Sequence, residues 1–100
     1  MIRHIVLFRF QTDASPIAIK GLIDAFRLLP RAITSVQAFE DGPSVSHEGL
    51  EDGYQHAFSM AFADVPARDA YLAHPAHQAF VTLAGSVVAQ ALVFDYELPV

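Results

Sequence analysis

Alternation of apolar and polar or small side chains is clearest in residues 2–10, where every second residue from Ile2 to Phe10 lies on one face. A period of two predicts a β-strand. The other face is also apolar at mid-strand, at Ile5 and Leu7, so we expect this strand to be covered on both faces. Residues 54–63 alternate large and small side chains and predict another strand. Less regular patterns predict strands at residues 33–40 and 87–98.

Two segments between these strands have the pattern of an amphipathic helix. Ser15-Pro16 is a helix start, with serine as the N-cap and proline in the first turn, and the apolar stripe runs to an expected stop at Pro30. Asp64 is expected to cap the second helix. Pro75 should break that helix, because proline lacks a backbone N–H and disfavours helical angles at the residue before it. We expect the helix to restart at Pro75 and to stop at Gly85.

Residues 41–53 contain three glycines, one proline and four acidic residues. The segment is too long for a tight hairpin, so we expect a solvated loop or a lid that carries a solvated His47.

The elements follow the order β-α-β-β-α-β in 100 residues, which predicts one domain over residues 1–100. The predicted fold class is α+β: a ferredoxin-like chain with a four-stranded antiparallel sheet and a broken second helix. The strands at 2–10 and 54–63 are expected to be central, parallel neighbours. Since His4 and His56 lie near the N-terminal ends of these strands, that arrangement would bring them close together.

Composition narrows the possible functions. The hydrophobic share of 53% is high for so short a chain and suggests a face buried by a partner. A net charge of −5, with six Lys and Arg, argues against binding to nucleic acid or an anionic membrane surface. No apolar run approaches the roughly 18 residues of a spanning helix, and no signal peptide is evident. The lack of cysteine fits a cytoplasmic protein.

The segment from Tyr71 to His77 holds the candidate chemistry. Tyr71, His74 and His77 are three residues apart, so a helix would place them on one face, and the break at Pro75 could aim the imidazoles into a cavity. His77 could act as a base, because imidazole has a pKa of about 6.5, while the Tyr71 hydroxyl donates a proton. Such a pair suits proton abstraction next to a carbonyl. The alternative is that His77 only bonds the backbone at a helix end.

The other histidines have open assignments. His4 and His56 could orient a ligand or the catalytic imidazole, or they could be buried and bonded to the main chain. His74 could serve the break itself, with its ring bonded to nearby backbone. A metal site is disfavoured, since His74 and His77 lack an evident third ligand, and the scattered glycines form no phosphate loop. We therefore predict neither a metal nor a cofactor.

Five stretches of the chain resemble, in order, the stress-responsive α/β-barrel (Dabb) family. They are Ile2–Phe8, Glu48-Gly49, Gly53–His56, Ala70–His77 and Phe94–Tyr96. One departure is the stretch Ile33–Val36, where the family often has a glycine. The resemblance implies a ferredoxin-like subunit whose sheet packs against that of a twin, forming a homodimeric α+β barrel.

The family resemblance also implies roles for individual residues. A plant polyketide cyclase is similar, and its catalytic histidine and tyrosine fall on His77 and Tyr71. Its other pocket histidines fall on His4, His56 and His74, which are therefore expected to contact substrate.

Three functions stay open from the sequence. The first is a cofactor-independent lyase, cyclase or isomerase that acts on a small carbonyl compound. The second is a non-catalytic barrel that binds an apolar ligand or has a structural role in stress. The third is a cofactor-free monooxygenase, an activity of another branch of dimeric α+β barrels. A cavity that touches His77 and Tyr71 would favour the first, and a site filled by Phe58, Phe62 or Phe80 would favour the second.

Overall fold

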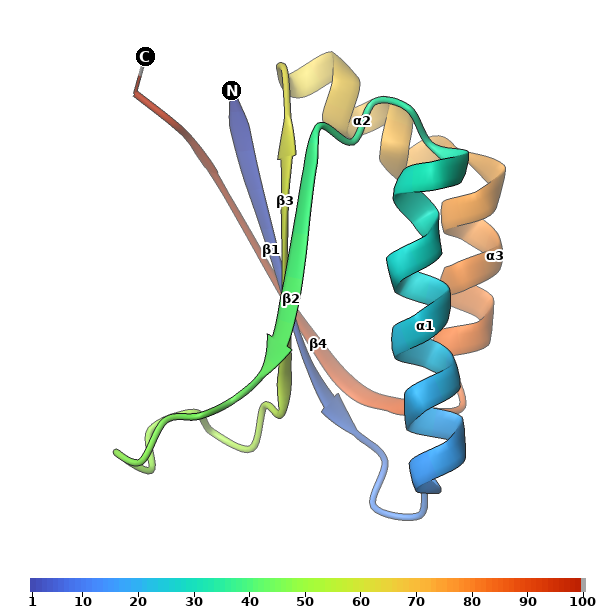
Figure 1. Cartoon of the computed structure of the whole chain (residues 1–100), viewed down its shortest axis with the longest axis vertical. Helices are drawn as coiled ribbons and strands as arrows, with labels where there is room; N and C mark the ends of the chain where they lie inside the picture. The colour runs from blue at the N-terminus through green and yellow to red at the C-terminus, as the bar shows by residue number, and fades with distance from the viewer. Residues whose placement is uncertain (100) are drawn as a thin grey trace.

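The computed structural model describes residues 1–99 and confirms the α+β, ferredoxin-like prediction (Figure 1). The elements are β1 (Ile2–Phe10), α1 (Pro16–Ala32), β2 (Ala38–Pro43), β3 (His56–Phe62), α2 (Val65–Ala73), α3 (Pro75–Ala84) and β4 (Val88–Glu97). The four strands form one antiparallel sheet in the order β2-β3-β1-β4. Figure 1 shows the helices on one side of this sheet, with α1 and α3 beside each other.

The central strands β1 and β3 run antiparallel, so the expectation that they are parallel is wrong. His4 pairs with Met60, and His56 pairs with Phe8. The N-terminal ends of antiparallel neighbours lie at opposite ends of the pair, and four residues of strand span about 13 Å at roughly 3.3 Å per residue. The sheet therefore holds His4 and His56 apart, which corrects the expected proximity of these two histidines.

Helix α1 begins where the sequence predicts. The Ser15 hydroxyl accepts a hydrogen bond from the Ala18 N–H at 3.1 Å, and proline occupies the first turn. The predicted stop at Pro30 is wrong, because the helix continues to Ala32. In the last turn the missing N–H of Pro30 costs only one helical bond. The helical hydrogen-bond pattern continues to the Ile33 N–H, which bonds the Leu29 carbonyl at 2.9 Å.

The predicted break in the second helix is confirmed. Asp64 caps α2 by accepting a bond from the Ala67 N–H at 2.9 Å. His74 has extended angles of φ −66° and ψ 138°, ends α2, and is the N-cap of α3, which starts at Pro75. Gly85 follows the end of α3, as expected. This corner turns the chain between Tyr71 and His77.

The second strand starts later than predicted. The range 33–40 was expected, but Ile33 is 3% exposed in a turn after α1, where the Val36 N–H bonds its carbonyl, and β2 covers Ala38–Pro43. Ile33 packs against the core from this turn, so its apolar side chain indicates burial and not a strand. The first three residues of the expected loop 41–53 thus belong to β2, and His47 beyond them is exposed.

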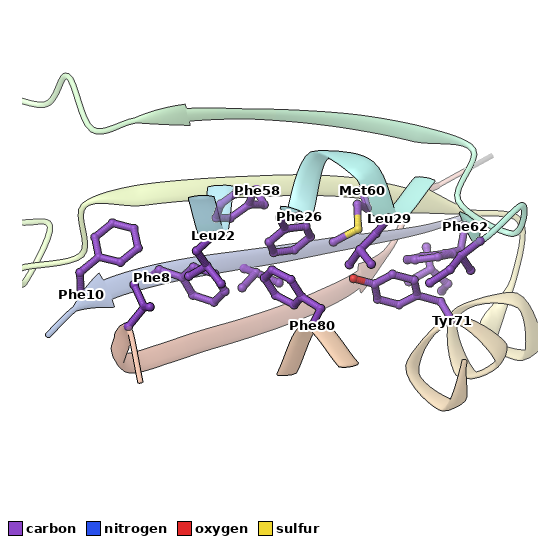
Figure 2. Close-up of a cluster of buried hydrophobic side chains, with 14 residues drawn as sticks. Phe8, Phe10, Leu22, Phe26, Leu29, Phe58, Met60, Phe62, Tyr71 and Phe80 are labelled. Carbon is purple, nitrogen blue, oxygen red and sulfur yellow. The ribbon is translucent and has the colours of Figure 1, made fainter. Parts of the chain in front are cut away.

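The core lies between the sheet and the helices and is rich in aromatic rings (Figure 2). Phe26 of α1 stacks on Phe58 of β3 with ring centroids 4.1 Å apart. Strand β1 alternates buried and half-buried residues, so one of its faces is covered by this core. The opposite face of the sheet, which we call the outer face, is largely exposed in the single chain, including Phe94 on β4 at 62%.

Candidate active site

A cavity of about 290 Å³ lies between α3 and the β4 side of the sheet. We call it the His77 cavity. Its wall is mostly apolar and includes Val6, Phe8, Phe26, Phe80, Val81 and Val93. Its polar groups are His4, Tyr71, His77 and Asp95, contributed by β1, α2, α3 and β4. Phe80 forms part of the wall and leaves the cavity open. A hollow of this kind, apolar with a few converging polar groups, is typical of a small-molecule site.

Tyr71 and His77 lie next to each other in this cavity. Their ring centroids are 4.7 Å apart. Tyr71 is 1% exposed and packs against Phe62, with 5.1 Å between ring centroids (Figure 2). Burial raises the pKa of the Tyr71 hydroxyl, so it keeps its proton and acts as a hydrogen-bond donor at neutral pH.

His77 has one ring nitrogen fixed by the backbone. Its Nδ1 is 3.1 Å from the Leu72 carbonyl oxygen, and because a carbonyl can only accept, Nδ1 carries the hydrogen. Burial lowers the pKa of His77, while the bond to Leu72 opposes this shift. The ring is therefore neutral at pH 7, with an unprotonated Nε2. The bond from His77 Nδ1 to the backbone leaves Nε2 free, so it is compatible with a role of His77 as a base.

His4 also lines the cavity and is the first member of a charged chain. Its Nδ1 donates to Asp95 Oδ1 at 2.5 Å, and Arg68 binds the other carboxylate oxygen. The His4 ring lies edge-on to Tyr71, with centroids 5.9 Å apart. His4, Tyr71 and His77 thus form one group, although they come from β1, α2 and α3.

His74 does not line the cavity. Its Nδ1 accepts a hydrogen bond from the Ala76 N–H at 3.0 Å, and its side chain caps α3. This matches the expectation that His74 serves the helix break.

His56 lies at the other end of the sheet, in a second charged chain. Its Nε2 donates to Asp41 Oδ2 at 2.7 Å, and Arg27 binds the same carboxylate with two nitrogens, at 3.0 and 2.8 Å. His56 borders a separate hollow of about 160 Å³ and does not contact the His77 cavity. The predicted contact of His56 and His74 with a ligand therefore gains no support from their positions.

Sequence reasoning did not assign a role to Asp95, Arg68, Asp41 or Arg27. Asp95 stood in the resembling stretch Phe94–Tyr96, and alternation along β4 places it on the face of its β1 partner His4. The resembling stretch was therefore the sequence signal that pointed to Asp95. Asp41 had no such signal, because its neighbours in sequence have the composition of a solvated loop, whereas its side chain is only 10% exposed.

Two further findings concern the described part of the chain. Among residues 1–99, no group of three or more His, Cys, Asp or Glu side chains is placed to hold a metal ion. No helix within this range has the length and apolarity needed to cross a membrane.

The fold and cavity define a ferredoxin-like α+β domain with a histidine–tyrosine site. Residues 2–98 match the family described as "Stress responsive A/B Barrel Domain" (Dabb). The stress-response A/B barrel domain-containing protein HS1 of Arabidopsis thaliana is 36% identical over 96 residues, covering 96% of this chain and 88% of the relative. The chain belongs to this family.

Other similar proteins have more specific names. Olivetolic acid cyclase of Cannabis sativa is 24% identical over 95 residues, covering 95% of this chain and 94% of the cyclase. A dimeric ferredoxin-like protein of unknown function from Thermobifida fusca has a TM-score of 0.81 and 28% identity, covering 97% and 90% of the two chains. Hydroxynitrile lyase from Passiflora edulis has the same fold, with a TM-score of 0.91 at 21% identity, covering 98% and 93%.

Proposed function

We propose that this protein is a cofactor-independent cyclase, lyase or isomerase that acts on a small apolar carbonyl compound. The observation that carries the proposal is the pairing of Tyr71 with His77 in an apolar cavity, where the Leu72 carbonyl fixes the His77 tautomer. The two pKa shifts support it, because they favour a neutral imidazole and a protonated phenol at the same pH.

The chemistry follows from these two groups. The Tyr71 hydroxyl donates a hydrogen bond to the substrate carbonyl oxygen and stabilises the enolate that forms there. The unprotonated Nε2 of His77 takes the proton from the neighbouring carbon. The resulting carbon nucleophile either attacks a second carbonyl in the same molecule, closing a ring whose new alkoxide takes the proton back from His77, or is reprotonated by His77 at another position. His4 contacts the same ligand from β1.

The names of two similar proteins fit this reaction class. Olivetolic acid cyclase and hydroxynitrile lyase are a cyclase and a lyase.

Hydrogen–deuterium exchange of a ketone tests the proposal without knowledge of the natural substrate. Phenylacetone is incubated in D₂O with the protein, and deuterium uptake next to the carbonyl is followed by NMR. The wild type should accelerate exchange, and His77→Gln and Tyr71→Phe should each lower the added rate by about 10²–10⁴-fold. His47→Gln is the matched control, because His47 is exposed in the loop after β2, and it should exchange at the wild-type rate.

The result that would overturn acid–base chemistry is a His77→Gln rate equal to that of the wild type and of His47→Gln. The protein would then be read as the alternative, a non-catalytic barrel that binds a ligand or has a structural role in stress. Ketone binding without exchange would support that alternative directly.

We also propose that the protein is a homodimer joined through the outer face of its sheet. Three apolar side chains of β4 on this face are exposed in the single chain: Leu92 at 47%, Phe94 at 62% and Tyr96 at 42%. Their partners in the adjacent strand β1 are Leu7, Ile5 and Arg3, in that order. Such an apolar patch on one sheet face fits a partner surface, and the similar protein from Thermobifida fusca is described as dimeric.

A further inference from the structure

Arg68 is one residue of this site that the acid–base scheme leaves without a task. It projects from α2, is about one-fifth exposed, and bonds Asp95 on β4 as well as its neighbour Asp69 at 2.9 Å. Asp95 uses its other oxygen to hold the His4 Nδ1. Arg68, Asp95 and His4 therefore form a continuous chain from the surface to the cavity wall.

This chain fixes which nitrogen of His4 faces the ligand. A carboxylate can only accept, so the His4 Nδ1 carries a hydrogen and Nε2 is the nitrogen left for other contacts. His4 lines the cavity, so its Nε2 is the ring nitrogen available to a ligand there.

The charge of Arg68 decides how Asp95 acts on His4. With the guanidinium bound, the carboxylate charge is balanced and Asp95 serves His4 as a hydrogen-bond acceptor. Without Arg68, one carboxylate oxygen loses its partner, and Asp95 is no longer held with Oδ1 against the His4 Nδ1. The guanidinium also ties α2 to β4, which restrains the orientation of the carboxylate.

We propose that Arg68 is a positioning residue that acts through Asp95, so that His4 presents an unprotonated Nε2 to the cavity as a second proton acceptor beside His77. The site then offers a phenolic donor flanked by two imidazole acceptors, whose rings lie 5.9 and 4.7 Å from Tyr71. This arrangement fits a ligand that has one carbonyl to accept from Tyr71 and a second acidic proton, on carbon or a hydroxyl, for His4. The catalytic consequence rests on the proposed function, but the state of His4 does not.

The protein contains a matched control for this inference. Arg27, Asp41 and His56 form a similar chain at the other end of the sheet, away from the His77 cavity. Replacing Arg27 with Met removes one guanidinium from one Arg–Asp–His chain, as Arg68→Met does, but leaves the chain at His4 intact.

Long-range ¹H–¹⁵N NMR of the histidine rings tests the inference at a single pH of 7.5, because the two ring nitrogens report tautomer and protonation separately. In the wild type, His4 should show a protonated Nδ1 and an unprotonated Nε2. Arg68→Met should lose this fixed pattern and give signals of both His4 tautomers, while Arg68→Lys, which keeps a charged donor for Asp95, should restore most of it. Arg27→Met should change His56 and leave His4 as in the wild type.

Two results would overturn the inference: an unprotonated Nδ1 on His4 in the wild type, or a His4 pattern unchanged in Arg68→Met. Neither result depends on turnover. If His4 behaves as expected but no variant, including the wild type, exchanges phenylacetone protons, the proposed function fails and the role of Arg68 in fixing His4 stands.

Discussion

Replacing Asp41 with alanine should destabilise the protein strongly while leaving the His77 cavity intact. The Asp41 side chain is 10% exposed and binds Arg27 and His56. Its loss leaves an unpaired N–H on His56, which is 7% exposed, at a cost of about 1–3 kcal/mol. The lost bond to Arg27 adds little, because Arg27 is half exposed and regains water. The expected loss is therefore about 2 kcal/mol, from the unpaired His56 N–H.

The measurement is urea unfolding followed by circular dichroism, at one protein concentration because the stability of a dimer depends on concentration. A loss of about 2 kcal/mol corresponds to a fall in melting temperature of roughly 8–16 °C for a domain of this size. Asp24→Ala is the control, because Asp24 pairs with Lys20 at 2.7 Å on the exposed surface of α1, and it should cost less than about 1 kcal/mol.

The pH dependence of this difference gives a second check. The hydrogen bonds from Arg27 are the main cause that lowers the pKa of Asp41 below its ordinary value of 3.8, and His56 adds to them. The stabilisation is thus complete above about pH 4 and is lost as the pH falls through the lowered pKa. Equal stabilities of Asp41→Ala and Asp24→Ala at pH 7 would refute the reasoning, and unchanged ketone exchange in Asp41→Ala is required if His56 lies outside the site.

Three other predictions follow from the structure. Phe94→Glu should turn the proposed dimer into a monomer in sedimentation velocity, whereas Ile17→Glu, at an 85% exposed site on α1, should not. Burial lowers the pKa of His77, so the wild type should lose stability relative to His77→Gln as the pH falls below about 6.5, measured by urea unfolding at pH 7.5 and 5. Asp64→Ala should cost about 0.5–2 kcal/mol through loss of the α2 cap, and exposed Asp13→Ala almost nothing, in the same assay.

Local patterns predicted most of the fold because the chemistry of each element is itself local. Ser15, Asp64 and Pro75 act within one turn of where they stand, so the helix starts and the break at His74 follow from neighbouring residues. Pro30 was misleading, since a proline near a helix end costs one bond rather than the helix.

Strand direction and the charged chains depend on residues distant in sequence. The antiparallel pairing of β1 with β3 places His56 away from His4. No residue near either histidine in the sequence indicates the direction of this pairing. The same holds for Asp41, which stands in a sequence typical of a solvated loop although Arg27 and His56 bind its side chain. Tyr71 and His77 could be paired from sequence because a single helix corner joins them.

Titration of His77 by NMR tests the central claim most directly, namely that this ring is an enclosed, neutral base beside Tyr71. We predict a pKa below the ordinary value of 6.5, a protonated Nδ1 in the neutral form, and ring signals that change in Tyr71→Phe. A His77 that titrates like a solvated imidazole, with mixed tautomers and no response to Tyr71→Phe, would contradict the account.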